Sequence, residues 1–406
     1  MEIVVLLVAF VLIIYLQSWI YKKYAFANIT YSCVLSKTEV FEGEEIELVE
    51  TIVNGKLLPV PWLKAEITAS RWLEFADPQS IITDTSRFVP SFFMLKGYQK
   101  ITRKWHVTCA RRGVHDIRNI ILVSSDLLGW NSLSMPIYTD AKVTVLPKIL
   151  DIDGAQLMPR YLLGDHLAQR QLIDDPFYTA GVREYAYGDP MNKIHWKSTA
   201  RQNQIMVRNN DFTTSQSLTV ILNMQTQVIE SGKVVFPQLA ENAIRVCASA
   251  FDQALGQGIP VRLATNSFTA LERNTIYTPE ASSNEHTLDL LRILARLELR
   301  STEDISVYLQ SIYDQTVSSD ILLVSAYLSE PIVEFARQKM EEGVHVRILV
   351  VGFVAAADLP GEDVDVVCLY DYFSRLAKGE QEAWERRQAT VPQGSQPVSE
   401  PVPHSA

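Results

Sequence analysis

Residues 218–222 read Leu-Thr-Val-Ile-Leu, an essentially apolar run without polar alternation. Strands with one wet face alternate, whereas strands buried on both faces of a parallel sheet are continuously apolar. A helix is predicted from Pro237, a residue favoured in the first turn, to about Leu255, where Gly256 and Gly258 end it. The run therefore predicts the first strand of an α/β domain.

Strands and helices continue to alternate along the chain. Strand-like runs are found at 260–264, 321–324, 344–351 and 364–369, and helical patterns at 286–297, 304–313 and 331–343. This alternation predicts a doubly wound sheet with helices on both faces. We assign residues 213–375 to this domain. Residues 376–406 are rich in Gln, Pro, Ser and Glu, which predicts a disordered tail.

Residues 28–150 follow a different pattern, with short runs of period 2 such as 45–53 and 62–67. Turn signals, among them Asn54-Gly55, separate these runs. Together they predict an antiparallel β-sandwich. Nothing in this region has the spacing of a catalytic site, and we expect His106 and His115 at its surface or rim.

The N-terminal stretch 3–21 has no charged side chain, and as a helix it is about 28 Å long, enough to cross a bilayer. Aromatic residues gather at its C-terminal end, and Lys22 and Lys23 follow at once. The positive-inside rule then predicts cytoplasmic C-terminal domains. We interpret residues 1–24 as a single-pass anchor in the cell membrane. A cleaved signal peptide, with Ala-Phe-Ala at 25–27 as its site, is the alternative, but the basic N-terminal region is missing.

Composition excludes several classes of function. The chain has 406 residues and a formal net charge of −10, which disfavours a nucleic-acid partner. Its four cysteines are widely separated and contain no C-x-x-C pair, which argues against both a disulfide scaffold and a zinc site. We expect reduced, mostly buried thiols and no cofactor.

The connector, residues 151–212, contains the densest cluster of polar chemistry, GDPMNKIHWKSTAR at 188–201. Residues 181–211 have five basic side chains against three acidic ones, a local charge of +2 in an acidic protein. The candidate site residues here are Arg183, Glu184, Tyr185, Gly188, Asp189, His195, Trp196, Lys197 and Arg201.

This part of the chain resembles the signature of domain-of-unknown-function family 58. The resemblance rests on Gly181–Tyr185, Gly188-Asp189, Ile194–Lys197, Ala200-Arg201 and Val207-Arg208. Arg111–Gly113 and Ser125–Trp130 resemble further stretches of that family. The resemblance implies a bacterial, membrane-anchored protein with a von Willebrand factor A-like domain. It also implies a non-catalytic adaptor or scaffold that works with MoxR-type AAA+ ATPases and transglutaminase-like membrane proteins.

Two departures from the family are visible. Its members commonly have two N-terminal membrane helices, whereas this chain has one, and Asn192 and Lys193 stand where arginines are frequent. Von Willebrand A domains often bind a metal through D-x-S-x-S after the first strand. Here those positions are Asn223, Gln225 and Gln227, whose neutral amides supply no charge for a divalent cation. We therefore predict that this degenerate site holds no metal.

Three interpretations of the cluster remain open. As a structural latch, it ties the sandwich to the α/β domain, with Trp196 buried as its anchor. As a docking surface, it presents Trp, Tyr and Arg to a protein partner. As a phosphate-directed hydrolase, it uses His195 as general base, oriented by Asp189. The sequence lacks a phosphate loop, a nucleophile elbow and a metalloprotease motif, so we favour a non-enzymatic role. Metal-dependent adhesion is a further alternative.

Overall fold

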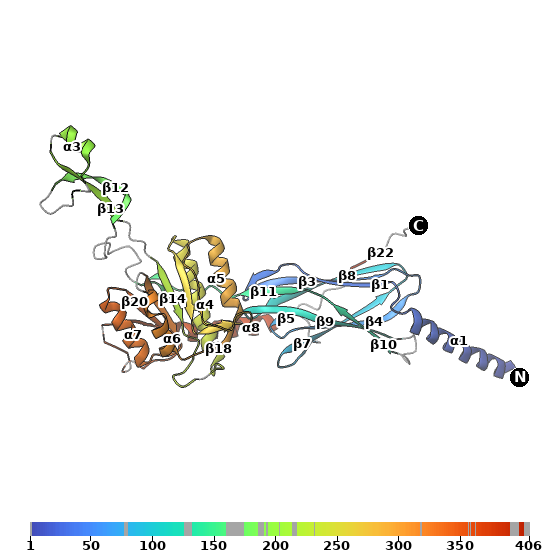
Figure 1. Ribbon diagram of the computed structural model, residues 1–406. Coiled ribbons are helices and arrows are strands. Elements are labelled where there is room, and N and C mark those ends of the chain that lie inside the picture. The colour runs from blue at the N-terminus through green and yellow to red at the C-terminus, as the bar shows by residue number, and fades with distance from the viewer. Residues whose placement is uncertain are drawn as a thin grey trace.

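The computed structural model has three parts in chain order: a helix, a region of antiparallel sheets, and an α/β domain from which a small arm extends (Figure 1). It describes residues 2–76, 80–125, 132–159, 174–185, 191, 194–202, 204–212, 217–230, 232–316, 319–355, 357, 359–361, 363–389 and 398–401.

Helix α1 (Glu2–Tyr24) confirms the predicted N-terminal helix. Its apolar window has a mean hydropathy of 2.7, and none of that window is buried inside the protein. It is therefore long and apolar enough to cross a membrane.

Two sheets make up the region that follows. The first has the order β1 (Ile29–Leu35), β3 (Glu45–Asn54), β8 (Gln99–Cys109) and β22 (Val398–Pro401), with β5 (Leu73–Phe75) also on β8. The second has the order β2 (Glu39–Phe41), β11 (Lys142–Leu146), β9 (Gly113–Ser125), β4 (Val60–Ser70), β7 (Ser86–Leu95) and β6 (Ile81–Ile82), with β10 (Ser132–Tyr138) also on β9. All pairs are antiparallel except β2 with β11.

The two sheets share one core, as the alternating pattern predicted. The carboxylate of Glu50, which is 0% exposed, joins them across this core. It accepts hydrogen bonds from Tyr31 (2.7 Å) and Trp105 (2.7 Å) in its own sheet and from Ser91 (2.8 Å) in the other. Burial, and next the charge of Glu50, raise the pKa of Tyr31 well above its usual value, so its hydroxyl stays a donor.

The α/β domain has the sheet order β17 (Ile276–Tyr277), β15 (Val261–Thr265), β14 (Leu218–Leu222), β19 (Asp320–Ser325), β20 (Val346–Val350) and β21 (Asp365–Cys368). Only the edge strand β17 is antiparallel. In chain order the sheet reads 3-2-1-4-5-6, a common doubly wound arrangement. A small pair, β16 (Ser267–Thr269) with β18 (Leu297–Ser301), lies beside it.

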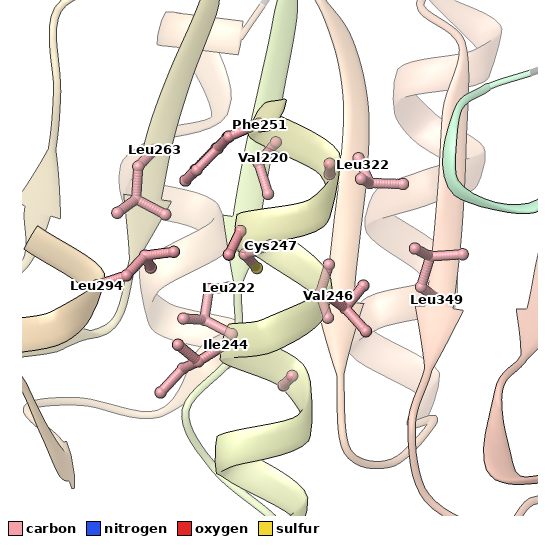
Figure 2. Packing of buried hydrophobic residues seen from close by; sticks show 14 of the residues in the cluster. Val220, Leu222, Ile244, Val246, Cys247, Phe251, Leu263, Leu294, Leu322 and Leu349 are labelled. Carbon is pink, nitrogen blue, oxygen red and sulfur yellow. The ribbon is translucent and has the colours of Figure 1, made fainter. Parts of the chain in front are cut away.

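Strand β14 is buried throughout because both of its faces are covered. Val220 and Leu222 pack with α4 (Pro237–Gly256), α5 (Asn284–Arg296) and α8 (Tyr370–Ala389) on one face. Ile221 packs with α6 (Ile305–Ser311) and α7 (Glu330–Glu341) on the other. Figure 2 shows α4 running along the strands, with Val246 and Phe251 among the core residues packed between helix and sheet. The predicted α/β organisation is confirmed at this level.

The first residues of the predicted connector, including α2 (Gly154–Leu157), pack on the α/β domain. Ile152, Leu157 and Met158 belong to its core, whereas Asp151, Asp153, Ala155 and Gln156 are exposed. The Nη1 of Arg347, a residue 1% exposed on β20, donates to the carbonyl of Ala155 at 2.6 Å. This segment is too short to show a helical period, which is why the sequence did not reveal it.

The predicted tail and the predicted position of His115 are also corrected. Helix α8 continues to Ala389, because 376–389 is rich in strong helix formers, and β22 pairs with β8.

His106 is exposed as expected, but His115 is buried. The ring nitrogens of His115 are hydrogen-bonded to Ser70 Oγ (3.0 Å) and to the Arg111 carbonyl (2.8 Å). Its place in the β9 alternation directs it inward.

A buried ion-pair cluster joins the sandwich to the α/β domain. Glu241 on α4 accepts hydrogen bonds from Nε and Nη2 of Arg111, at 3.0 and 2.7 Å, and from Nε of Arg112 at 2.7 Å. Arg112 also donates to the carbonyl of Leu294 (2.6 Å) near the C-terminal end of α5, where carbonyls lack helical partners. Gly113 follows with a φ of +137°, a conformation that other residues rarely adopt, as the chain enters β9.

Two further pairs cross the junction with the opposite polarity. Glu42 of the sandwich accepts two hydrogen bonds from Arg245 on α4, at 3.1 and 2.7 Å. Glu39 accepts two from Arg292 on α5, at 2.8 and 2.9 Å. Bidentate arginine–carboxylate pairs fix orientation as well as contact. Rotation of the sandwich on the α/β domain therefore requires all of these pairs to break.

Glu241→Gln is expected to lower the free energy of unfolding by about 3 kcal/mol, because it leaves Arg112 buried without a counter-charge. Urea denaturation measures this change. Glu44→Gln is the control, since Glu44 pairs with Lys37 at 3.6 Å in an exposed position, and its loss should change stability by less than about 1 kcal/mol. Equal effects of the two substitutions would contradict the importance of the junction.

The junction also predicts a pH dependence. Burial raises the pKa of Glu241, but the charges and hydrogen bonds of Arg112 and Arg111 outweigh it and hold this pKa below its usual 4.5. Stability from the ionised carboxylate is thus full above pH 4.5 and is lost as pH falls through the lower folded-state pKa. In thermal melts, the difference between wild type and Glu241→Gln should shrink as pH falls below 4.5. A difference that stays constant would rule out this linkage.

Candidate functional site

The described signature residues lie in a small arm made of β12 (Asp174–Glu184), α3 (Trp196–Gln202) and β13 (Met206–Phe212). The two strands pair antiparallel, and α3 packs on β13. Figure 1 shows the arm standing away from the α/β domain, and no extensive contact joins its described residues to either domain.

The arm has a small core of its own. Ile194, Met206 and Val207 are 5%, 5% and 1% exposed, and Ile194 forms a β-bridge with Val207. The amide of Tyr185 donates to the carbonyl of Ile205 at 2.9 Å, which continues the pairing past the end of β12. These contacts hold Ile194 and the start of α3 against the hairpin.

His195 caps α3. Its Nδ1 accepts a hydrogen bond from the amide of Ser198 at 3.1 Å, and its carbonyl accepts from the hydroxyl of Thr199 at 3.1 Å. That hydroxyl also accepts from the amide of Met206 at 3.0 Å, so the cap is tied to β13. Because an amide can only donate, Nδ1 is unprotonated and the neutral imidazole has its proton on Nε2. In that state neither nitrogen is free to remove a proton from a substrate.

The described surface of the arm exposes apolar and basic side chains near α3, together with the acidic Glu184 and the polar Gln202 and Gln204. We define the arm tip as the exposed residues that surround α3: Tyr185, Met191, Trp196, Lys197, Arg201 and Ile205. The side chain of Trp196 is 71% exposed and that of Met191 is 75% exposed. Lys197 and Arg201, four residues apart, lie on the same face of the helix. The sequence pattern does not single out Met191 and Ile205, because isolated apolar residues in a loop have no periodicity.

The structure corrects part of the latch interpretation. Trp196 is not a buried anchor, and the described signature residues do not lie between the two domains. Arg111, Arg112 and Glu241 occupy that position instead. The sequence pointed to this junction only through the resemblance of Arg111–Gly113 to the family. The ion pairs themselves could not be predicted, because the paired residues lie more than a hundred positions apart in sequence.

The remaining signature residues are placed as follows. Arg183 is on β12 opposite Val207, and Glu184 is opposite Met206. Gly188 and Asp189 lie outside the described residues. The predicted pairing of Asp189 with His195 therefore stays a prediction.

A second candidate site lies at the carboxyl ends of β14 and β19, where ligands bind in doubly wound folds. Asn223 Nδ2 donates to Ser325 Oγ at 3.0 Å, and Asn223 Oδ1 accepts from the Gln225 amide at 3.1 Å. Gln225 Oε1 accepts from the amide of Ile305 at 2.8 Å, at the start of α6. Both side chains are 1% exposed, and their amide oxygens already accept protein hydrogen bonds.

Two carboxylates border this amide network and are also engaged. Asp304 accepts from Gln225 Nε2 at 3.3 Å and caps α6, and Glu230 accepts from Thr226. Burial raises the pKa of Asp304, but its hydrogen bonds outweigh this and lower it overall. Gln227 lies apart, with its Nε2 on the carbonyl of Ile229. Among the described residues, no group of three His, Cys, Asp or Glu side chains is arranged to hold a metal ion.

A groove of 740 Å³ opens beside the junction, between Trp72, Arg111, Leu271 and Leu299. Arg111 stacks on Trp72, with its guanidinium 4.6 Å from the ring centre. The same guanidinium is paired with Glu241, so the charge of Arg111 already has a partner within the protein.

Part of the chain matches a known protein family. Residues 181–363 match the family described as "Protein of unknown function DUF58". The match begins in the arm and extends through most of the α/β domain. No curated protein matches the chain.

Similar solved structures include the CARDB domain of a Pyrococcus furiosus protein, at 12% identity and a TM-score of 0.19, covering 30% of this chain and 96% of that one. A non-cellulosomal cohesin from Archaeoglobus fulgidus has 14% identity and a TM-score of 0.20, covering 30% and 92%. Spo0M, a sporulation control protein from Bacillus subtilis, has 13% identity and a TM-score of 0.18, covering 29% and 49%. Likenesses this weak support no conclusion about fold or function.

The buried amide network predicts that Asn223 is structural. Asn223→Ala removes hydrogen bonds to Ser325 and Asn266 and leaves the buried amide of Gln225 without its acceptor, and should lower the free energy of unfolding by about 2 kcal/mol. Asn274→Ala, in an exposed loop, is the matched control and should have little effect. Denaturant unfolding measures both variants. Unchanged stability of Asn223→Ala would show that the network contributes nothing.

Proposed function

The chain belongs, through residues 181–363, to the DUF58 family of unknown function, and on that premise we propose that it is a membrane-anchored, non-catalytic adaptor. The arm tip is its docking surface for a protein partner. The observation that carries this proposal is the exposure of Trp196, which is 71% exposed on an arm that stands apart from both domains.

Physical chemistry supports a docking role for this surface. Exposed apolar residues that gather on one surface mark interaction sites, and Trp and Arg are the usual anchors of interface hot spots. Lys197 and Arg201 add positive charge next to that anchor, which favours an acidic partner surface and sets its orientation. His195 holds the helix that presents them.

The rest of the molecule is proposed to position this surface. Helix α1 anchors the chain in the cell membrane, and Lys22 and Lys23 retain the C-terminal domains in the cytoplasm. Strands of the sandwich run from the end of α1 to the charged junction. Strand β3 has 10 residues and spans about 34 Å. The sandwich is thus a rigid spacer between bilayer and α/β domain.

We assign the α/β domain to the von Willebrand A-like class. Its 3-2-1-4-5-6 sheet with one antiparallel edge strand supports this assignment. The resemblance of the signature favours a MoxR-type AAA+ ATPase as partner, with a transglutaminase-like membrane protein as a second. Metal-dependent adhesion is disfavoured, because the amide oxygens of Asn223 and Gln225 are already hydrogen-bonded within the protein.

The hydrolase alternative is weakened by the cap. A general base needs an unprotonated nitrogen directed at the substrate, whereas the Nδ1 of His195 accepts the Ser198 amide. A role in proton transfer requires α3 to lose its cap first.

Co-purification from membranes tests the docking surface. We expect Trp196→Ala/Lys197→Ala to lose an AAA+ ATPase partner, identified by mass spectrometry, with a yield reduced by about tenfold or more. The melting temperature should not change, because both side chains are exposed. The matched control is Tyr138→Ala/Lys142→Ala, an exposed aromatic residue and an exposed lysine on the sandwich, which should retain the partner.

Two results would contradict the proposal. Retention of the same partners by both double variants would remove the arm tip as the docking surface. A large fall in melting temperature for Trp196→Ala/Lys197→Ala would make the pair structural.

A further inference from the structure

The exit of the anchor helix is fixed to the sandwich by hydrogen bonds. The hydroxyl of Tyr21 donates to the carbonyl of Pro59 at 3.0 Å. Lys56 Nζ donates to the carbonyls of Ala25 and Ala27, both at 2.6 Å. Tyr21 is 5% exposed, so the last turn of α1 is packed on the sandwich. The loop 55–59 is therefore held at the level where the apolar helix ends.

A second loop lies beside this one. The amide of Tyr98 donates to the carbonyl of Lys56 at 3.0 Å, and Asn54 Nδ2 donates to the carbonyl of Lys96 at 2.9 Å. A side chain at Gly97 would clash with the carbonyl of Leu57, so the two loops are in close contact. They form one end of the sandwich, next to the anchor.

This end of the sandwich has an exposed apolar side chain, Leu57, and several exposed lysines. Leu57 is 77% exposed, although the loop that carries it is anchored on both sides. Lys22 and Lys23 at the end of α1 and Lys96 in the second loop are exposed, and within the part of the chain that the structure describes, none of the three is in an ion pair. Lys23 lies 5.5 Å from the ring centres of Trp19 and Tyr24, residues suited to the headgroup region.

We propose that this end of the sandwich binds the anionic headgroup layer of the membrane that α1 crosses. Leu57 enters the headgroup layer, and Lys22, Lys23 and Lys96 contact lipid phosphates. The inference rests on the proposed membrane anchor. It goes beyond that anchor because it makes the sandwich itself a lipid-binding element. Attraction of lysines to anionic lipid acts within about 10 Å of the surface, and the loop 55–59 is hydrogen-bonded directly to the chain where the apolar helix ends.

The lipid contact sets the orientation of the whole protein. A single helix allows the attached domain to tilt, whereas a helix together with a second contact restricts it. The sandwich strands then stand along the membrane normal, and the arm tip is held far from the bilayer.

The test uses the full chain in vesicles, with a fluorescent probe at position 57. Cys368 is the one exposed cysteine among the four, so Leu57→Cys in a Cys368→Ser background allows labelling with nitrobenzoxadiazole. Leu271→Cys in the same background is the matched control, because Leu271 is 80% exposed and belongs to the α/β domain. Vesicles contain either phosphatidylcholine alone or phosphatidylcholine with phosphatidylglycerol.

We expect the emission of the probe at 57 to shift to shorter wavelength in phosphatidylglycerol vesicles. Headgroup-labelled quencher lipids should quench it at least about twofold more than in phosphatidylcholine alone. Lys96→Glu should remove most of this difference, as should high salt. The probe at 271 should report water in both membranes.

Two outcomes overturn the inference: a probe at 57 that reports water in both membranes, or one that is equally quenched in both. Flotation of the vesicles separates this failure from failure of the anchor. Protein that does not float with vesicles contradicts the membrane anchor itself, whereas floating protein with a water-exposed probe contradicts only the lipid contact of the sandwich.

Discussion

The arrangement of the protein depends on one buried carboxylate at the junction of its two domains. Glu241 has 6% of its side chain exposed and pairs with Arg111 and Arg112, of which the second is almost fully buried. Burying any one of these charges alone would be costly. The three side chains pair with one another only when the sandwich and the α/β domain meet in one orientation. The charge-reversed pairs Glu42–Arg245 and Glu39–Arg292 reinforce the same orientation.

Rigidity at this junction gives the other parts of the molecule a defined place. Hydrogen bonds from Tyr21 and Lys56 fix the anchor helix to one end of the sandwich, and the ion pairs fix the α/β domain to the other end. The arm is different, because its described residues pack mainly on one another. In the proposed function, the rigid sandwich and α/β domain therefore position the arm, and the exposed Trp196 of the arm contacts a protein partner.

Local pattern predicted much of this fold. The run at 218–222 indicated a strand buried on both faces, and period-2 alternation indicated the sheets of the first domain. What sequence could not reveal were interactions between distant residues, such as Arg112 with Glu241, and positions that depend on packing, such as buried His115 and exposed Trp196. The sequence pattern around a tryptophan is the same whether another domain of the chain or a partner protein covers its side chain. The end of α8 was missed because composition was read as disorder, although local helix propensity was high.

The most direct test of the account is photocrosslinking in cells from position 196. A benzophenone side chain in place of Trp196 should give one discrete adduct with a partner protein. The same group at Tyr138, which is 82% exposed on the sandwich, should not give that adduct. Absence of any adduct from position 196, or identical adducts from both positions, would contradict the claim that the arm tip is the docking surface.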